Sequence, residues 1–328
     1  MESSIGRATV EYVIRAALLV MLLSMSVAGA QNGPPADEFV TLGTLGGPIP
    51  NAKRSQPANA LMVGDDVYLV DVGDGAAGRL AAAGIPLTRI QGIFLSHLHF
   101  DHTGGLFAVL GLAAQTSVPN TLAVYGPPGT RQLVDGLLAG MQPALNAGYG
   151  IPGQHWSAHV TVTELESGSV VELPGVKVSV AENSHYSFPA DSDEARRYKS
   201  LSYRFDLPDR SIVYTGDTGP SASVESLAKD ADLLVSEIID VEGVMAALRS
   251  SRPDLGSEAL QNAERHLSTH HLSPCEVGQL ASRAGIAAVV LTHYVPAPAD
   301  EDALSGFEAA VRRCFDGDVY PAEDLRRY

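Results

Sequence analysis

The sequence predicts a four-layered αββα sandwich, in which two mixed β-sheets pack face to face and helices cover their outer faces. In the first half, short β-type runs surround an Ala-rich helical segment at residues 75–83, which gives a strand, helix, strand order. In the second half, β-type runs recur before helices alternate with buried strands. With 328 residues, 45% of them hydrophobic, the chain can form one large domain or two fused halves.

The elements of the first half follow from apolar runs and the turn residues between them. Gly64-Asp65-Asp66 separates two β-type runs and predicts a hairpin. Further along, Leu133, Leu137 and Leu138 share one face of a helix. Strands are therefore expected at residues 39–42, 60–63, 67–70, 91–96 and 122–125, and helices at residues 75–83 and 130–141.

The second half repeats this order and ends rich in helix. Pro274 stands at the start of a helical segment, where proline is well tolerated. Strands are expected at residues 160–162, 176–180, 201–205, 212–214, 233–236 and 287–291, with a helix at residues 274–284. Functional side chains are expected on the loops where these strands end.

The first thirty residues differ from the rest and predict a secretory signal peptide. Arg7 and Arg15 precede an apolar run, and Ala28-Gly29-Ala30 supplies the small residues that a signal peptidase requires. The uncharged run is shorter than the ~20 residues of a spanning helix, so no stable membrane anchor is expected. The predicted organisation is a signal peptide at 1–30, a linker at 31–37 and a hydrolase domain at 38–328, in a periplasmic or secreted protein.

The formal net charge of −16 indicates which partners to expect. Proteins that hold long nucleic acids neutralise phosphates with Lys and Arg, and this sequence has no basic run. A small-molecule ester is therefore the expected substrate, and no nucleic acid partner is expected. The sequence leaves open whether the chain forms a homodimer.

The two cysteines, Cys275 and Cys314, allow two interpretations. In an oxidising compartment they can pair as a disulfide. Cys275 also stands at an expected helix start, where a buried thiol is equally natural. Both interpretations remain open from the sequence.

The segment from Ser96 to His102 carries three histidines and an aspartate within six positions, and it predicts a metal site. Imidazole nitrogens and carboxylate oxygens are ligands that Zn²⁺ or a similar cation accepts. His97 and His99 can reach one ion from an extended loop, and Asp101 and His102 can reach a second beyond the bend. The alternative is an ordinary polar turn.

This His-x-His-x-Asp-His pattern after an apolar strand resembles the signature of the metallo-β-lactamase fold, whose members use it to bind one or two metals. Residues 42–48, 68–75, 216–219 and 291–293 resemble further motifs in that family's order. The resemblance covers about residues 38–296. It implies a dinuclear Zn²⁺ site.

The resemblance also implies the remaining ligands. His185 would join His97 and His99 on the first ion, Asp217 would bridge both ions, and His293 would complete the second with Asp101 and His102. The alternatives are a surface histidine, a turn aspartate and a core histidine. Metal-bound histidines usually donate their other N–H to a carboxylate, a role expected for Asp71 and less strongly for Asp74. The implied metal ligands are His97, His99, Asp101, His102, His185, Asp217 and His293.

His271-Leu272-Ser273-Pro274 resembles a motif of the ribonuclease Z and arylsulfatase-like branch of this fold. In that branch the histidine acts near the leaving group together with an acidic residue, whose place Glu237 occupies here. His271 and Glu237, with Asp101, are therefore the expected catalytic residues.

Taken together, these residues predict an exported hydrolase that cleaves a small phosphodiester, sulfate ester or related ester through attack by a metal-bound hydroxide. A lactonase or a β-lactamase of the same fold is the alternative. A β-lactamase normally lacks the bridging aspartate, and a lactonase does not need His271. A non-catalytic metal-binding protein would be expected to have lost ligands, and none is missing. The short segment between His185 and Asp217 also lacks the long arm of tRNA-processing relatives.

Overall fold

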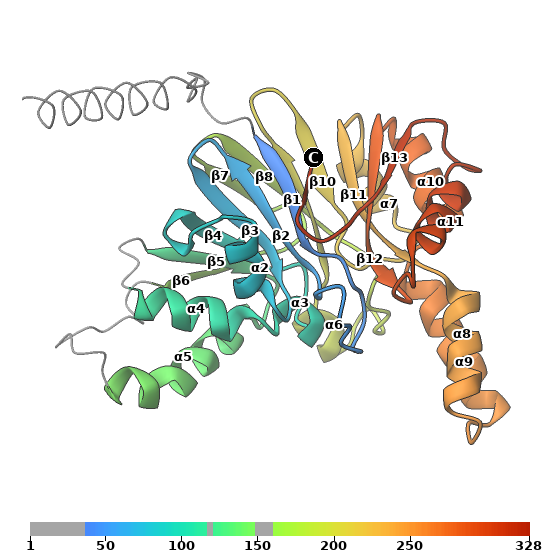
Figure 1. The fold of residues 1–328 in the computed structure, drawn as a ribbon, viewed down its shortest axis with the longest axis horizontal. Coiled ribbons are helices and arrows are strands. Elements are labelled where there is room, and N and C mark those ends of the chain that lie inside the picture. The colour runs from blue at the N-terminus through green and yellow to red at the C-terminus, as the bar shows by residue number, and fades with distance from the viewer. Residues whose placement is uncertain (1–36, 117–120, 148–159) are drawn as a thin grey trace, which may run out of the picture. The chain divides into compact units, whose positions relative to one another are not determined.

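The computed structural model describes residues 37–116, 121–147 and 160–328 (Figure 1). The chain divides into residues 1–35, which lie outside the described part, and a second unit formed by residues 36–328. The predicted signal peptide and all of the predicted linker except Asp37 therefore lie outside the described residues. Among the described helices, none combines the length and hydropathy that a membrane span requires.

The first of two seven-stranded sheets belongs mostly to the N-terminal half of the chain. Strands β1 to β3 pair antiparallel, whereas β3 to β6 run parallel to one another. Strand β14, from far along the chain, pairs with the edge of β1, with Val40 opposite Arg327. The spatial order is β14 (Arg326–Arg327), β1 (Glu38–Gly43), β2 (Ala58–Val63), β3 (Asp66–Val72), β4 (Ile90–Phe94), β5 (Leu122–Gly126) and β6 (Val160–Glu164).

The second sheet has the same mixed character. Strands β7 to β10 pair antiparallel, and β10 to β13 run parallel. Because β8 and β10 are both antiparallel to β9, strands β8, β10, β11 and β12 all end at the same edge. The spatial order is β13 (Asp318–Pro321), β12 (Ala288–Val295), β11 (Leu233–Ile239), β10 (Ser211–Tyr214), β9 (Leu201–Asp206), β8 (Val176–Glu182) and β7 (Val170–Leu173).

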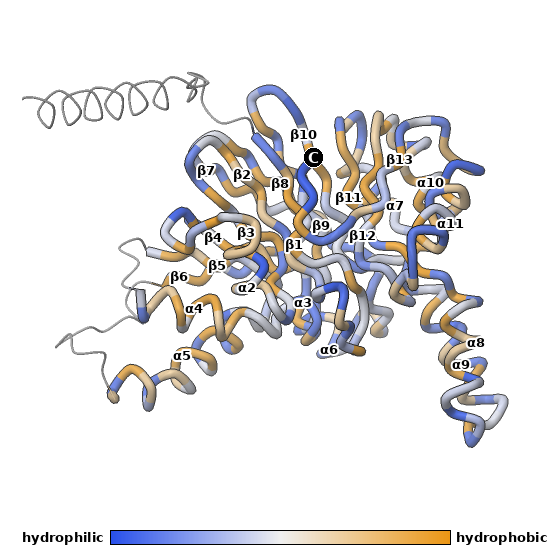
Figure 2. Tube along the Cα trace, in the orientation of Figure 1, coloured by the Kyte–Doolittle hydropathy of each residue, from blue (hydrophilic) through white to orange (hydrophobic). Residues whose placement is uncertain are grey.

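The two sheets pack face to face, as the αββα prediction requires. The buried Phe94 ring of the first sheet lies 5.4 Å from Tyr203 and 5.6 Å from Phe205 of the second, measured between ring centroids. Aromatic pairs at such distances stabilise a core beyond the area that they bury. Figure 2 shows hydrophobic residues along many of the strands, while several connecting loops are hydrophilic. This confirms the predicted αββα sandwich.

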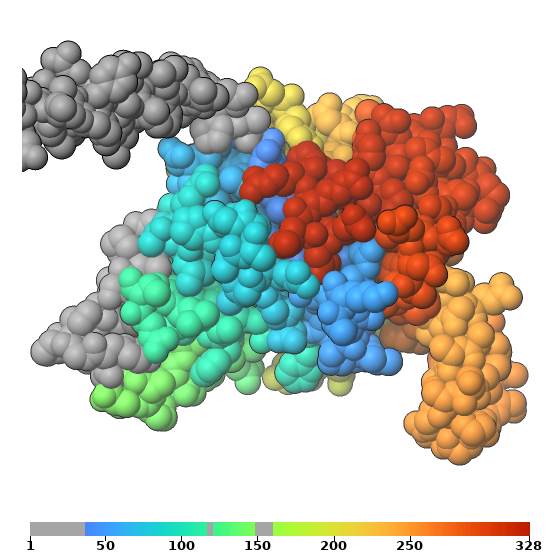
Figure 3. All heavy atoms as spheres, viewed as in Figure 1, coloured from blue at the N-terminus to red at the C-terminus, as the bar shows by residue number. Residues whose placement is uncertain are grey.

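Helices form the outer layers. A second apolar cluster joins the first sheet to α2, α4 and α5, and a third joins the second sheet to α7, α10 and α11. Helices α8 and α9 instead project from the sandwich as a hairpin (Figures 1 and 3). Among the described residues, the helices are α2 (Ala76–Ala82), η1 (Leu87–Arg89), α3 (Phe100–Thr103), α4 (Leu106–Gln115), α5 (Thr130–Ala147), α6 (Asp193–Arg197), α7 (Ala222–Ala228), α8 (Val241–Ser251), α9 (Ser257–His270), α10 (Pro274–Ala284) and α11 (Glu301–Val311).

Several elements extend further than their sequence patterns predict, and α5 and β12 do so by the most residues. Helix α5 contains Pro143 and yet continues past Met141 to Ala147. It continues because Leu145 still packs on the apolar cluster of the first sheet. Strand β12 continues past residue 291 to Val295, because it pairs with β11 again beyond a register shift. His293 therefore lies within a strand rather than after one.

Cys275 and Cys314 form a disulfide, with their Cα atoms 5.4 Å apart. The bridge joins the first turn of α10 to the segment that follows α11. The structure thus selects the disulfide over the buried thiol.

Candidate metal centre

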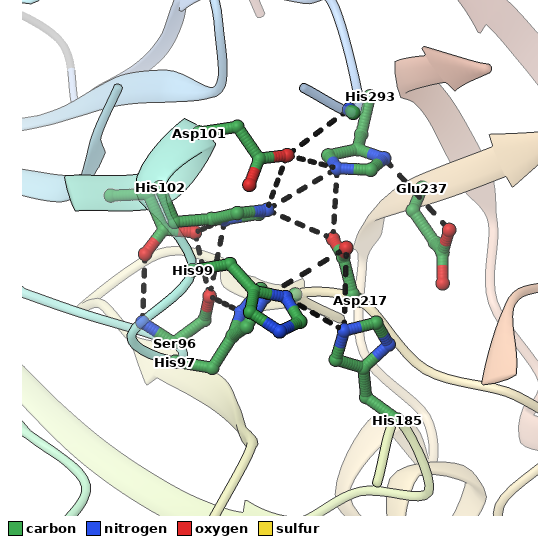
Figure 4. A network of polar contacts seen from close by, with 12 residues as sticks. Ser96, His97, His99, Asp101, His102, His185, Asp217, Glu237 and His293 are labelled. Carbon is green, nitrogen blue, oxygen red and sulfur yellow. Dashed lines mark hydrogen bonds and ion pairs between the residues drawn. The ribbon is translucent and has the colours of Figure 1, made fainter. Parts of the chain in front are cut away.

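Predicted site residues from both sheets converge at one end of the sandwich (Figure 4). Strand β4 of the first sheet ends just before Ser96, and β8 and β10 of the second end before His185 and Asp217. Glu237 and His293 stand near the ends of β11 and β12. Strand ends provide a rigid base for polar side chains on short loops.

Three histidines form the first of two candidate ligand groups, called ligand groups below. Nε2 of His97 lies 2.9 Å from Nδ1 of His99, which lies 3.2 Å from Nε2 of His185. His97 and His185 are buried, whereas His99 is exposed. The group therefore opens to solvent on the side of His99.

The second ligand group contains Asp101, His102, Asp217 and His293. Oδ1 of Asp217 lies 3.2 Å from Nε2 of His102 and 3.1 Å from Nε2 of His293. Its other oxygen, Oδ2, lies 3.9 Å from Nε2 of His97 in the first group. Asp217 thus stands between the two groups with one oxygen toward each, as a bridging carboxylate would.

The proton positions in the histidine rings also suit a cation. Ser96 Oγ donates its only proton to Asp71, so it accepts from Nδ1 of His97 at 3.0 Å. Nδ1 of His102 is held by Asp71 at 2.7 Å, and Nδ1 of His185 by the carbonyl of His270 at 3.1 Å. In the neutral rings these contacts leave the Nε2 lone pairs facing the centre of the site.

A buried oxygen supports the same interpretation. Asp217 Oδ1 has no hydrogen-bond partner among the described residues, although two Nε2 atoms lie within 3.2 Å. An unsatisfied buried carboxylate oxygen is costly unless a cation neutralises it. The residues present therefore fit metal ions with nitrogen and oxygen ligands.

The pKa values of the ligands follow from burial and from one another's charge. Burial lowers the pKa of His97 well below its usual value and that of His185 to about 3, which keeps both rings neutral as metal binding requires. Burial alone would raise the pKa of Asp217, but His293 and His102 outweigh it and hold the carboxylate ionised.

His102 and His293 differ from these two, because carboxylates lie beside them. Burial alone would lower the pKa of His102, but Asp217, Asp71 and Asp101 raise it well above its usual value. The pKa of His293 is raised in the same way by Asp217 and Asp101. The carboxylates that favour a proton on His102 would equally favour a metal cation beside it.

Asp71 lies directly against His102, where a residue expected to orient the metal ligands would lie. Its Oδ2 accepts from His102, from the hydroxyl of Ser96 at 2.7 Å and from Tyr214 at 2.8 Å, and its Oδ1 accepts from the backbone N–H of Ser96 at 2.7 Å. The Asp71 backbone has a positive φ of 58°, which is rare for a residue other than glycine. Asp74, the other candidate for this role, is exposed.

Replacing Asp71 with asparagine should weaken metal binding without removing a ligand. The amide offers only one acceptor oxygen and would place N–H groups against donors that now bond to a carboxylate. We expect metal affinity to fall by ~10–100-fold, as measured by competition with a chelator. Asp74→Asn is the matched control and should retain the affinity of the unchanged protein. Equal affinities for both variants would contradict the role of Asp71.

His271 and Glu237 form the predicted pair beside the ligands. Nδ1 of His271 donates to Oε2 of Glu237 at 2.6 Å, while Oε1 accepts from the backbone N–H of Thr218 at 2.5 Å. Burial alone would lower the pKa of His271, but the charge and hydrogen bond of Glu237 raise it to about 9. Its ring centroid lies 5.0 Å from that of His185 and 6.2 Å from that of His293. His271 is therefore a proton-bearing group close to both ligand groups.

The sequence did not indicate the contribution of the loop after β1. The backbone N–H of Gly47 donates to Oδ2 of Asp101 at 3.0 Å. At Gly46, a Cβ atom would lie 2.4 Å from Nδ1 of His293, so only glycine leaves room for that ring. This glycine-rich loop belongs to one of the motifs that resemble the family, and that resemblance was the one sign of its importance. Its partners, Asp101 and His293, are far away in the sequence.

Residues 68–294 match the family model described as "Beta-lactamase superfamily domain". The chain belongs to this superfamily. A ribonuclease Z from Mycobacterium sp. (strain KMS) is 32% identical over 297 residues, which cover 88% of this chain and 95% of the relative. The ribonuclease Z of Mycobacterium bovis (strain BCG / Pasteur 1173P2) is 30% identical over 301 residues, covering 88% and 97%.

Solved structures show the same fold at lower identity. The metallo-β-lactamase fold protein YhfI from Bacillus subtilis has a TM-score of 0.62 and 20% identity, covering 89% of this chain and 99% of its own. The human short form of tRNase Z has a TM-score of 0.59 and 20% identity, covering 89% and 98%. With the histidine and aspartate groups above, these findings identify a metal-dependent hydrolase of the metallo-β-lactamase fold.

The expectation that no nucleic acid is a partner is wrong. It relied on net charge and on the missing arm, but relatives that match along nearly their whole length are named ribonuclease Z. The charge of a whole chain does not describe its site, where bound cations can neutralise phosphate groups.

Proposed function

We propose that this chain is a dinuclear metal-dependent phosphodiesterase with two Zn²⁺ ions. The observation that carries the proposal is the His271–Glu237 pair, 2.6 Å apart, beside two ligand groups that share Asp217. A phosphodiester has a poor leaving group and benefits from a positioned acid. The relatives named ribonuclease Z support phosphodiester chemistry over the alternatives, and RNA belongs among the candidate substrates together with small phosphodiesters.

The proposal assigns a role to each part of the site. His97, His99 and His185 would hold one ion, Asp101, His102 and His293 the other, and Asp217 both. When bound, the ions would lower the pKa of water and polarise the phosphoryl oxygen. Asp71 keeps His102 oriented, and Gly47 fixes the Asp101 carboxylate. The proposed metal ligands are thus the seven residues expected from the sequence.

The His271 ring would carry the proton needed at the leaving oxygen. Its Nδ1 is occupied by Glu237, so Nε2 is the atom available to the substrate. Because Glu237 also accepts from the backbone of Thr218, the carboxylate is fixed and holds the ring in one orientation. His271 would therefore protonate or stabilise the departing alkoxide.

A panel of substrates tests this proposal. The purified protein should hydrolyse bis(p-nitrophenyl) phosphate and a short RNA with a 3′ extension faster than p-nitrophenyl sulfate, an acyl lactone or nitrocefin. Preference for the sulfate ester would favour an arylsulfatase-like enzyme, and preference for the lactone would favour a lactonase. No hydrolysis of any of these by the metal-loaded protein would leave metal binding without catalysis.

We also propose that the protein is exported. Residues 1–30 have the pattern of a signal peptide, and the disulfide between Cys275 and Cys314 suits an oxidising compartment. The mass of the mature N-terminus, measured on protein from fractionated cells of an expression host, tests this. An uncut chain in the cytoplasmic fraction would contradict export.

A further inference from the structure

Three aromatic side chains lead outward from the first ligand group. The Tyr186 ring centroid lies 5.4 Å from that of His99 and 5.0 Å from that of His185. Phe188 follows at 5.6 Å from Tyr186, and Tyr198 at 5.9 Å from Phe188. We call Tyr186, Phe188 and Tyr198 the aromatic row. It begins on the side where the site opens, because His99 is exposed.

The outer two rings of the row are exposed to solvent. Phe188 is 38% and Tyr198 48% exposed, although both are large apolar groups. The planes of successive rings are tilted by 46° and 45°, so the rings of the row do not stack in parallel on one another. Exposed apolar surface beside a site often marks a place where a ligand binds.

The segment that carries the row is held in place. Ser192 caps α6 by accepting from the backbone N–H of Ala195 at 3.0 Å. Next to Tyr198, Lys199 donates to both carboxylate oxygens of Glu182 at 2.9 and 3.0 Å. The guanidinium carbon of Arg197 lies 6.0 Å from the centre of the Tyr198 ring. The backbone next to the outermost ring, Tyr198, is thus held by the Lys199–Glu182 ion pair, and the cationic side chain of Arg197 lies beside the ring.

The row and the proposed acid share one neighbour, His185, and extend from it to different residues. Tyr186 also lies beside His99 of the first ligand group, whereas His271 also lies beside His293 of the second. A phosphodiester bound at both ligand groups would place its leaving oxygen toward His271. The part of the substrate that the reaction retains would then extend toward the row.

We propose that the aromatic row is a stacking subsite for a nucleobase on the retained side of the scissile phosphate. This inference rests on the proposed phosphodiesterase function and names its substrate class. Nucleobases stack on exposed aromatic rings whatever their sequence, and arginine beside the ring adds to this interaction. Because the row is continuous with His99, the retained group of any ester held by the ligand groups reaches Tyr186 first. The relatives named ribonuclease Z favour a nucleotide as that group.

Three substrates with one leaving group test the subsite. They are thymidine 5′-(p-nitrophenyl phosphate), methyl p-nitrophenyl phosphate and hexyl p-nitrophenyl phosphate. We expect kcat/KM for the nucleoside ester to exceed that for the methyl ester by about tenfold or more, since stacking on one ring contributes about that much. In Phe188→Leu and Tyr198→Leu this advantage should fall by about fivefold or more, because leucine keeps apolar bulk but removes the ring.

Tyr320→Leu is the matched control. Tyr320 is 37% exposed but lies on β13, at the edge of the second sheet and outside the row. This variant should keep the nucleoside advantage of the unchanged protein. An equal gain for the hexyl ester would show a general apolar surface and overturn the assignment to a nucleobase. So would an advantage that both row variants leave intact.

Direct binding separates failure of the subsite from failure of the proposed function. Calorimetry on the metal-loaded protein should show tighter binding of thymidine 5′-monophosphate than of methyl phosphate, with the difference reduced in both row variants. If the three esters are not hydrolysed but this difference is present, the proposed function fails and the subsite stands. If the esters are hydrolysed without any nucleoside preference in rate or binding, the subsite alone fails.

Discussion

Removing metal from the purified protein is expected to abolish its hydrolytic activity. Elemental analysis before treatment should give close to two zinc-like ions per chain, since the two ligand groups supply seven residues. After treatment with a chelator, the loss should reach at least about 10³-fold, because the residues that remain do not by themselves activate water. Restoring Zn²⁺ should restore the rate.

Asp217→Asn provides the matched test of the shared carboxylate. One oxygen of Asp217 lies near each ligand group, so the amide should weaken at least one ion while leaving the fold intact. We expect less than two ions per chain and a similarly large loss of rate. Full activity in a protein with only trace metal would refute the dinuclear proposal.

His271→Ala is expected to give the second largest effect and to separate acid chemistry from metal binding. The variant should lose ~10²–10⁴ in kcat on a phosphodiester with a basic alkoxide leaving group. It should lose far less on a p-nitrophenyl ester, whose leaving group departs without a proton. Metal content should stay unchanged, because His271 bonds to Glu237 and is not one of the seven proposed ligands.

His266→Ala is the control for this experiment. His266 stands on α9, the helix that ends just before His271, and is exposed. The His266→Ala variant should lose no more rate on the substrate with the alkoxide leaving group than on the p-nitrophenyl ester. If His271→Ala instead loses metal together with activity, His271 is a ligand, as its place near His185 and Asp217 would allow. Unchanged rates on both substrates would favour a lactonase-like function.

The sequence predicted best the features that depend on residues close together in the chain. The turn after β4 carries His97, His99, Asp101 and His102 within six positions, so its metal chemistry is visible without a structure. The strands could also be predicted, because short apolar runs bounded by turn residues are typical of buried strands. His185, Asp217 and His293 needed the family resemblance, since each is a single residue at the end of a distant element.

Contacts between distant segments could not be predicted. Nothing local shows that Gly46 must leave space for His293 or that Tyr214 donates to Asp71. The Cys275–Cys314 pairing depends on how α10 packs on α11, which the sequence left open. The exclusion of nucleic acid failed for a related reason, because net charge averages over surfaces that do not touch the site.

The pairing of β14 with β1 sets an order on folding. The backbone of Phe39 exchanges hydrogen bonds of 3.1 and 2.9 Å with Tyr328, and Asp324 accepts from the backbone N–H groups of Thr44 and Ser55. These partners lie more than 250 residues beyond β1 in the sequence, so they reach it late. Until then the outer edge of β1, and the start of the loop that contacts Asp101 and His293, lack their partners. Such long-range closure is slow and exposes strand edges, so the first sheet should be completed late in folding.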